Sequence, residues 1–560
     1  TSSSDPAPDS EESNRPPADS DAHDGQQDDP RDEQQDEQSG EFSRPVVRWR
    51  EFAATVGLAA VCDVTIYHGQ GFAGLAVLFF AAPLLLWMGS KQTPRTWIGG
   101  LLHVLLIALA VKMIWCGSVL LATVGFALLF ARATSLAGLR PHVLQVMLFA
   151  AQTIPAGFSG VVDHVRTASR VPCPLNRTNW LNVALPLFAL AMFSALFVFA
   201  NPDLLQWVQE GMRFLDDWFQ GWIWDFTPEP LEAAFCVAAF WIAAGALRPI
   251  IRRWSSAGRD DRDRDADDQR EPRKQEPAFL FPACRNVLIS VTILFAAYLA
   301  FEFKTLGFRE FPEGFYYSGY AHEGAAWLTV ALGLSTVMLS LIFRGNVLDD
   351  PRLPRLRRLG WLWSLENMLL AVAVYNRLFI YIGFNGLTRM RIVGLFGMTA
   401  VVVGFLFVLW KISRNRSFTW LIRNHLAALA AAVFLYAMIP VDAIVVSYNT
   451  RRILAGDLAP CVQISVHPIS AEGVLFLKPL LQCQDATIRE GVRAMLAERH
   501  FEAEQLAKRR KALGWTAFQF ADAFVLAELR ADKSKWAIYA AAARREAALR
   551  RFHDYAYRWY

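Results

Sequence analysis

Long apolar runs alternate with short polar loops along most of this sequence. Between Arg44 and Tyr448 one unit recurs: roughly 18–22 apolar residues, then a short charged or Pro/Gly-rich loop. A helix of that length crosses a hydrocarbon core about 30 Å thick. The pattern therefore predicts an all-α integral membrane protein with about eleven transmembrane helices. The predicted spans lie near residues 50–68, 71–88, 97–112, 114–131, 181–200, 231–250, 283–302, 323–343, 362–382, 390–410 and 425–447.

Two further apolar stretches do not fit a simple span. Prolines interrupt residues 139–158, so we expect an interfacial or re-entrant helix there. Residues 204–226 carry apolar positions at helical spacing, flanked by acidic residues and tryptophans. Such a segment is typical of an amphipathic helix on the membrane surface. A lid packed on the protein's own helices explains it equally well.

Polar segments divide the chain into five parts. Residues 1–43 are acidic and too polar to fold alone, which predicts a disordered tail that is either solubilising or a docking segment for a basic partner. Residues 252–280 form a highly charged linker, also predicted to be disordered. The linker separates an N-terminal membrane half, 44–251, from a C-terminal half, 281–448. Residues 449–560 then form a mostly helical tail long enough for a small domain.

The basic loops predict the orientation of the chain. Lys and Arg concentrate in alternate loops, and cytoplasmic loops carry such an excess. With eleven spans, all the strongly basic loops fall on one face. The N-terminus is then cytoplasmic and the tail of residues 449–560 lies on the outer side. The loop at 383–391 is an exception, since it places Arg389 and Arg391 outside.

The composition supports a membrane protein and offers no catalytic signature. Hydrophobic residues make up 54% of the chain, against about 45–50% in soluble domains. We find no P-loop, GxSxG, HExxH or CxxC motif. We therefore expect no enzyme activity, cofactor, bound metal or nucleic-acid partner. Cys461 and Cys483 are the only cysteines of the tail, and either a disulfide or two buried free thiols fits the pattern.

Polar residues inside the predicted spans are the best candidates for a functional site. A charge within a bilayer is costly and usually pairs or lines a cavity. Arg377 either reaches the headgroups with its long side chain or faces inward to pair with Asp442 or Glu366. Asp442 is the favoured partner, because its predicted depth is closer. Candidates for an intramembrane polar site are Glu366, Asn376, Arg377, Asp442 and Asn449, and further polar residues within spans are His103 and Glu302.

A second candidate site lies at the outer mouth of the span at 323–343. The stretch "SGYAHEG" places Tyr320, His322 and Glu323 close together. An ordinary helix start accounts for them, since an acidic residue in the first turn suits the helix dipole. A proton-responsive or ligand-contacting mouth is the alternative, because histidine titrates near neutral pH.

The second half of the sequence resembles a known family. The motifs are "YAHEG" (320–324), "YNRLFIYIGFNGLTRMRI" (375–392) and "IPVDAIVVSYNTRR" (439–452). In these the chain resembles bacterial multi-pass membrane proteins of the domain of unknown function 4153/4173 family. The resemblance implies a bacterial cytoplasmic (inner) membrane location and offers no catalytic residues to carry over.

Two functional hypotheses follow. The first is a permease-like protein with a polar site between the spans at 362–382 and 425–447, because proline-interrupted charged spans are typical of transporter sites. The second is a membrane sensor, or an assembly or scaffold protein, acting through the outer tail and the cytoplasmic charged segments. The expected partners are the lipid bilayer and proteins that bind residues 1–43, 252–280 or 449–560. The sequence does not indicate an oligomeric state.

Overall fold

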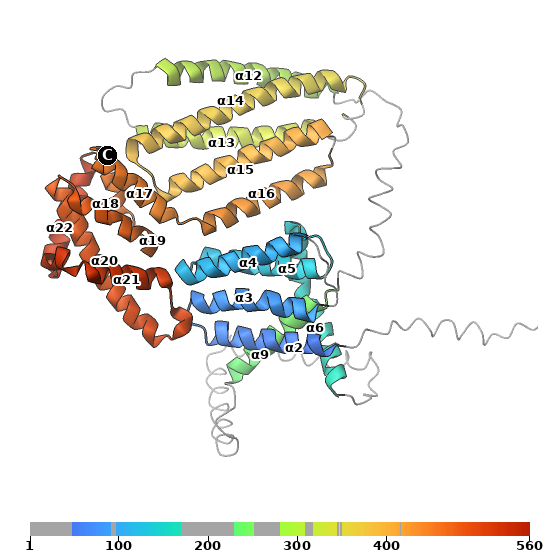
Figure 1. Ribbon diagram of the computed structural model, residues 1–560. Helices are drawn as coiled ribbons and strands as arrows, with labels where there is room; N and C mark the ends of the chain where they lie inside the picture. The colour runs from blue at the N-terminus through green and yellow to red at the C-terminus, as the bar shows by residue number, and fades with distance from the viewer. Residues whose placement is uncertain are drawn as a thin grey trace, which may run out of the picture. The chain divides into compact units, whose positions relative to one another are not determined.

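The protein is helical throughout the part described by the computed structural model (Figure 1). That part comprises residues 47–90, 97–169, 229–250, 281–308, 317–343, 347, 350–414 and 416–559, without the side chains of 168–169, 230, 305–308 and 317–326. The absence of strands in these ranges confirms the predicted all-α class. The bundle helices are α2 (Trp49–Cys62), a π-turn η1 (Asp63–Tyr67), α3 (Phe72–Gly89), α4 (Trp97–Cys116), α5 (Val119–Leu136), α6 (Val143–Ser169), α9 (Pro230–Leu247), α12 (Phe281–Phe308), α13 (Tyr317–Ile342), α14 (Leu353–Asn385), α15 (Arg389–Arg414) and α16 (Phe418–Met438). The tail helices are α17 (Val441–Leu454), α18 (Cys461–Val466), α19 (Ala471–Val474), η3 (Leu475–Gln482), α20 (Ala486–Ala512), η4 (Trp515–Ala517), α21 (Phe520–Ala531), η5 (Lys533–Tyr539) and α22 (Ala542–Tyr557).

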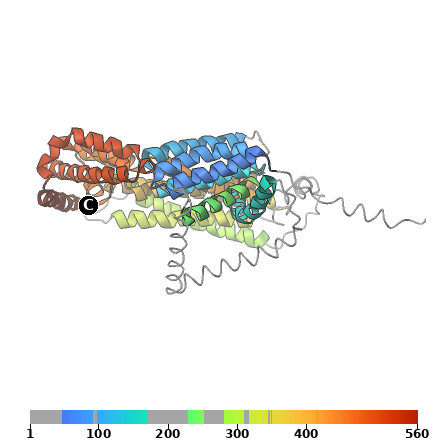
Figure 2. The ribbon, with the colours of Figure 1, turned by 90° about the horizontal axis from the view of Figure 1, so that it is seen from below.

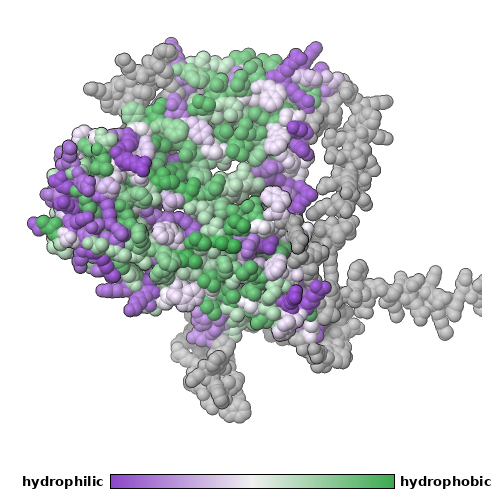
Figure 3. Space-filling view, viewed as in Figure 1, coloured by the Kyte–Doolittle hydropathy of each residue, from purple (hydrophilic) through white to green (hydrophobic). Residues whose placement is uncertain are grey.

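The bundle helices have the length and surface of membrane spans. Within the described ranges, α3, α4, α5, α6, α12, α14, α15 and α16 are long and apolar enough to cross a bilayer. Shorter apolar helices lie at Leu231–Leu247 and Trp327–Ile342. Large apolar side chains point outward from the bundle, among them Leu294 at 64% and Leu334 at 67% exposure. Apolar residues accordingly cover much of the visible bundle surface, whereas the tail surface is polar (Figure 3). Lipid is the solvent that such a surface fits.

The last predicted span ends earlier than the sequence pattern suggested. The expected span at 425–447 is divided between α16, which ends at Met438, and α17, which begins at Val441. Pro440 lacks an N–H and disfavours helical backbone in the residue before it, so the helix cannot continue. Asp442 and Asn449 therefore lie in α17, beyond the apolar span, which corrects their predicted place inside it.

Several sequence predictions fall outside the described residues. They are the disordered tail (1–43), the span at 181–200, the amphipathic segment at 204–226 and the linker at 252–280. The count of about eleven spans stays a prediction for that reason.

Helices α2–α5, α9 and α12–α16 run between two chemically different ends of the bundle (Figure 1). We call them the basic end, where α2, α4 and α14 begin, and the tail end, where these helices finish. Arg248, the residue after α9, binds the Glu51 carboxylate in the first turn of α2, so both helices meet at the basic end. Lys and Arg gather there in the terminal turns of the helices and in the loops between them. They are Arg48, Arg50, Arg132, Arg140, Arg355, Arg358, Lys411, Arg414, Arg416 and Arg423.

Helix α6 lies across the basic end (Figures 1 and 2). Near its start, Gln152 accepts a hydrogen bond of 2.9 Å from the backbone of Ile250. Eleven residues further on, Asp163 binds Arg248 at 2.7 Å. A helix aligned with α9 would advance about 16 Å over those eleven residues, yet both contacts fall just after the end of α9, on Arg248 and Ile250. The contacts show that α6 crosses α9 near the end of α9, and Pro155 does not interrupt α6. The interfacial or re-entrant placement of α6 stays a prediction.

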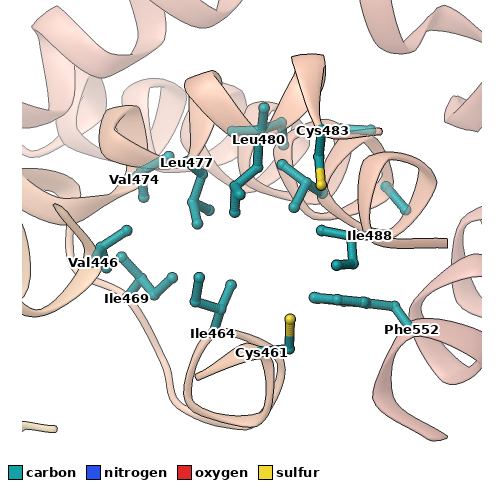
Figure 4. Close-up of a cluster of buried hydrophobic side chains, with 14 of the residues drawn as sticks. Val446, Cys461, Ile464, Ile469, Val474, Leu477, Leu480, Cys483, Ile488 and Phe552 are labelled. Atoms are coloured by element: carbon teal, nitrogen blue, oxygen red, sulfur yellow. The ribbon is translucent and has the colours of Figure 1, made fainter. Parts of the chain in front are cut away.

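The tail has an apolar core of its own (Figure 4). Val446 and Ile453 from α17 enter this core together with Cys461, Cys483 and Phe552 from the helices that follow. Both cysteines are buried free thiols in the structure. Of the two alternatives that the sequence allows, the structure therefore has the free thiols and not the disulfide between Cys461 and Cys483.

The tail also contacts the N-terminal half of the bundle. Lys112 near the end of α4 forms an ion pair with Glu472 of α19. Gln519 donates a hydrogen bond of 3.1 Å to the carbonyl of Met113. The second contact satisfies a backbone carbonyl at the end of α4 that no helical partner reaches.

The Cys461 thiol should be unreactive in the folded protein. Burial raises the pKa of this thiol to about 12, and only the thiolate reacts with alkylating agents. We expect iodoacetamide at pH 8 to modify Cys461 and Cys483 only after denaturation, as measured by peptide mass spectrometry. If neither is modified after denaturation without a reductant, the two form a disulfide in the isolated protein.

Candidate functional site

The turn between α14 and α15 is the anchor for the tail. Helix α14 ends at Asn385, and the next residue, Gly386, has a φ of +81° that suits a residue without a side chain. The next residue, Leu387, donates its N–H to Asn449 Oδ1 at 2.8 Å and accepts from Asn449 Nδ2 at 2.8 Å. One amide side chain of α17 thus satisfies both backbone groups of Leu387. These two hydrogen bonds fix the position of α17 against the α14–α15 turn.

Asp442 makes the second contact between α17 and this turn. Its carboxylate forms a bidentate ion pair with Arg389, the first residue of α15, and accepts a hydrogen bond of 2.6 Å from the Ser470 N–H. Burial would raise the pKa of Asp442, but the hydrogen bonds from Arg389 and Ser470 outweigh it and hold the pKa below its usual value. The predicted pairing of Asp442 with Arg377 is therefore wrong. Arg389, the exception in the loop pattern, is the partner.

Arg377 is paired within the bundle. Its Nε and Nη2 donate to the two carboxylate oxygens of Glu302 in α12, at 2.5 and 2.6 Å. Tyr298 adds a hydrogen bond of 3.0 Å to the same carboxylate. Arg377 is 6% exposed and Glu302 is 0% exposed. Arg377 therefore does not reach toward the headgroups, and its partner is neither Asp442 nor Glu366.

The remaining predicted residues do not join this pair. Glu366 lies in α14 at 8% exposure, and its Oε2 has no hydrogen-bond partner among the described residues. Asn376 is exposed. Tyr320, His322 and Glu323 lie in the first turns of α13, and their side chains are outside the described set.

A cavity of about 790 Å³ lies between the α14–α15 turn and the tail. Its walls come from α13, α14, α15, α17 and the segment around α18. Apolar side chains form most of the wall, including Leu378, Val393 and Met398. Gln463 and His467 of the tail also line it. The cavity is thus an apolar chamber with polar groups at the end nearest the tail.

Arg391 is the most unusual group in this wall. It is 5% exposed, its Nη1 donates to the Gly386 carbonyl, and its guanidinium stacks on the Tyr381 ring at 3.8 Å. Its Nε has no hydrogen-bond partner among the described residues. A buried charged donor without an acceptor is costly, and Arg391 lines the cavity, so its guanidinium group has hydrogen-bonding capacity left for a ligand.

The glycines of α15 leave room in the same wall. Gly394 and Gly397 line the cavity, and a Cβ added at either would meet no atom within 4 Å. Neither this wall nor Glu302 as the partner of Arg377 was predicted from the sequence. The only available signals were the two arginines in the outer loop and a glutamate within a span.

These features define a multi-pass membrane protein with a helical domain anchored at one end of the bundle and a cavity at the junction. A family model described as "Domain of unknown function (DUF4153)" matches residues 53–469. The chain therefore belongs to this family, as the motifs at 320–324, 375–392 and 439–452 indicated. No curated protein and no solved structure matches the chain.

Removing one member of the Arg377–Glu302 pair should destabilise the bundle. Arg377→Gln or Glu302→Gln alone leaves a buried charge without its partner, at a cost of about 3–5 kcal/mol. The double variant should lose less than the sum of the two single losses. Unfolding of the purified protein in detergent measures this.

The matched control is Arg358→Gln, an exposed arginine on the same helix, which should change stability by less than about 0.5 kcal/mol. Strictly additive losses in the double variant would contradict the pairing.

Acid should weaken the anchoring of α17. The pKa of Asp442 is lowered in the folded protein. Its contribution to the free energy of unfolding is therefore complete above the unfolded-state pKa of about 3.9, and it is lost as the pH falls through the folded-state pKa. Asp442→Asn should remove that part of the acid dependence. Melting temperatures between pH 7 and pH 3 measure the effect. Equal acid sensitivity of the variant and the parent would contradict it.

Proposed function

We propose that the protein binds a lipid-class amphiphile with an anionic headgroup in the cavity between α15 and the tail. The observation that carries the proposal is the buried Arg391 guanidinium, with an unpartnered Nε, in an otherwise mainly apolar wall. A phosphate or carboxylate matches a guanidinium in charge and in geometry. The apolar wall suits an acyl chain better than a hydrophilic solute.

The dimensions of the cavity fit such a ligand. Its wall follows α15 from Arg389 to Met398, a rise of about 14 Å at 1.5 Å per residue. Half of a hydrocarbon core is about 15 Å. A ligand with its head beside Arg391 and its chain along Gly394 and Gly397 would therefore lie at the depth of one leaflet.

The exposure of the rim supports entry from the bilayer. Met390 and Val393 line the cavity and are also exposed on the surface of the bundle. An amphiphile can then enter sideways, keeping its chain in an apolar environment. The gathering of Lys and Arg at the basic end favours a cytoplasmic position for that end. This orientation puts the cavity in the outer leaflet of the cytoplasmic membrane and the tail outside.

Sensing is the second candidate function, and one observation favours it. Gln463 and His467 belong to the tail, yet they line the cavity together with the membrane helices. A ligand bound in the cavity would therefore alter the contacts between the tail and α15. A permease role receives less support, because Arg377 and Glu302 bind each other within the bundle.

Filling the cavity tests the proposal. Gly394→Leu and Gly397→Leu place a side chain into the open space beside α15 and should reduce binding of a photoreactive anionic phospholipid at least tenfold. Cross-linked peptides from nanodisc-embedded protein, quantified by mass spectrometry, give the readout. A photoreactive zwitterionic phospholipid should label the parent protein less than the anionic one does.

Gly100→Leu is the matched control. Gly100 also has open space around an added Cβ, but it lies in α4, away from the cavity. This variant should label like the parent. Equal labelling of α15 in all variants, or no preference for the anionic lipid, would overturn the proposal.

A further inference from the structure

A second cluster of chemistry-bearing side chains lies at the tail end of the N-terminal half. Asp63 and His68 come from the turn between α2 and α3, and Glu232 comes from the first turn of α9. His68 Nε2 lies 3.1 Å from Glu232 Oε1 and 3.9 Å from Asp63 Oδ2. One ligand atom from each of the three residues lies within 4.8 Å of the other two.

The backbone at this turn brings two of these residues together. Residues 63–67 form a π-turn, closed by a hydrogen bond of 2.9 Å from the His68 N–H to the Asp63 carbonyl. In an α-helix, residues five apart point about 140° away from each other. The wider π-turn lets both side chains face α9. Such turns are frequent at functional sites.

Further donors surround the cluster. Cys236, one turn after Glu232, lies with its Sγ 3.5 Å from Asp63 Oδ1. Tyr67 donates a hydrogen bond of 3.3 Å to Glu229, and its ring packs edge-on against His68. An imidazole and two carboxylates thus meet between α9 and the α2–α3 turn, with the Cys236 thiol beside Asp63. The two carboxylates are partly buried, and His68 is exposed.

We propose that Asp63, His68 and Glu232 bind a divalent transition-metal ion, preferably Zn²⁺, with Cys236 as the fourth ligand. Two ligands on a tetrahedral zinc ion are about 3.3 Å apart when each bond is about 2.0–2.1 Å. The observed separations of 3.1 and 3.9 Å bracket this value, so small side-chain movements complete the site. Nitrogen and sulfur donors favour zinc over magnesium or calcium.

The ion would fasten α9 to the α2–α3 turn. Its charge balances the two carboxylates, and the Cys236 thiol loses its proton to the solvent when it binds. The sequence pattern predicts no metal, because the ligands follow no CxxC or HExxH spacing. Asp63 and His68 are more than 160 residues away from Glu232 and Cys236 in the chain, and the fold brings the two pairs together.

Metal content tests the site directly. Full-length protein purified in detergent, stripped with a chelator and dialysed against micromolar Zn²⁺, should retain one zinc ion per chain by mass spectrometry of the element. His68→Ala and Glu232→Gln should each weaken binding at least tenfold in a competition titration with a chromogenic chelator. Co²⁺ substitution should give a thiolate charge-transfer band in the near ultraviolet, and Cys236→Ser should remove it.

His553→Ala is the control. His553 is also exposed, and its Nδ1 lies 3.8 Å from the Asp554 carboxylate. Among the described residues, these two side chains do not belong to any group of three possible metal ligands. This variant should keep the parent's affinity and cobalt spectrum. Absence of zinc from the parent, or equal retention by His68→Ala, would overturn the proposal.

Discussion

The tail end of the molecule depends on how α17 is held against the turn between α14 and α15. Pro440 ends the last span, so the chain must leave α16 and start a new helix. Asn449 satisfies both backbone groups of Leu387, and Asp442 binds Arg389. Val446 of the same helix enters the core of the tail. One short helix therefore links the membrane bundle to the tail and forms a wall of the cavity.

The buried charges obey a single physical constraint, which is that an apolar surrounding penalises any charge without a partner. Arg377 meets Glu302, and Lys411 donates to the carbonyls of Ser340 and Phe343 at the end of α13. Arg391 meets the constraint only in part, since its Nε has no partner among the described residues. Arg377 and Lys411 therefore stabilise the bundle, whereas we assign Arg391 to ligand binding.

The sequence predicted elements better than it predicted contacts. Apolar runs of span length and the clustered basic loops were enough for the helices and for the basic end. The partner of Arg377 was not predictable, because periodicity shows which face of α14 is buried but not that α12 packs against it. Asp442 was misplaced since the apolar pattern continues across Pro440. Asp63, His68 and Glu232 were missed because a π-turn has no spacing signature in the sequence.

The central claim is that the α15–α17 junction encloses an amphiphile whose head meets Arg391. An electron cryomicroscopy map of the protein in nanodiscs containing an anionic phospholipid tests it most directly. We expect density for a headgroup within hydrogen-bond distance of the Arg391 guanidinium, continuing as a chain beside Gly394 and Gly397. A map in which α15 and α17 close together, or in which Arg391 binds a side chain and the space holds no elongated density, would contradict the account.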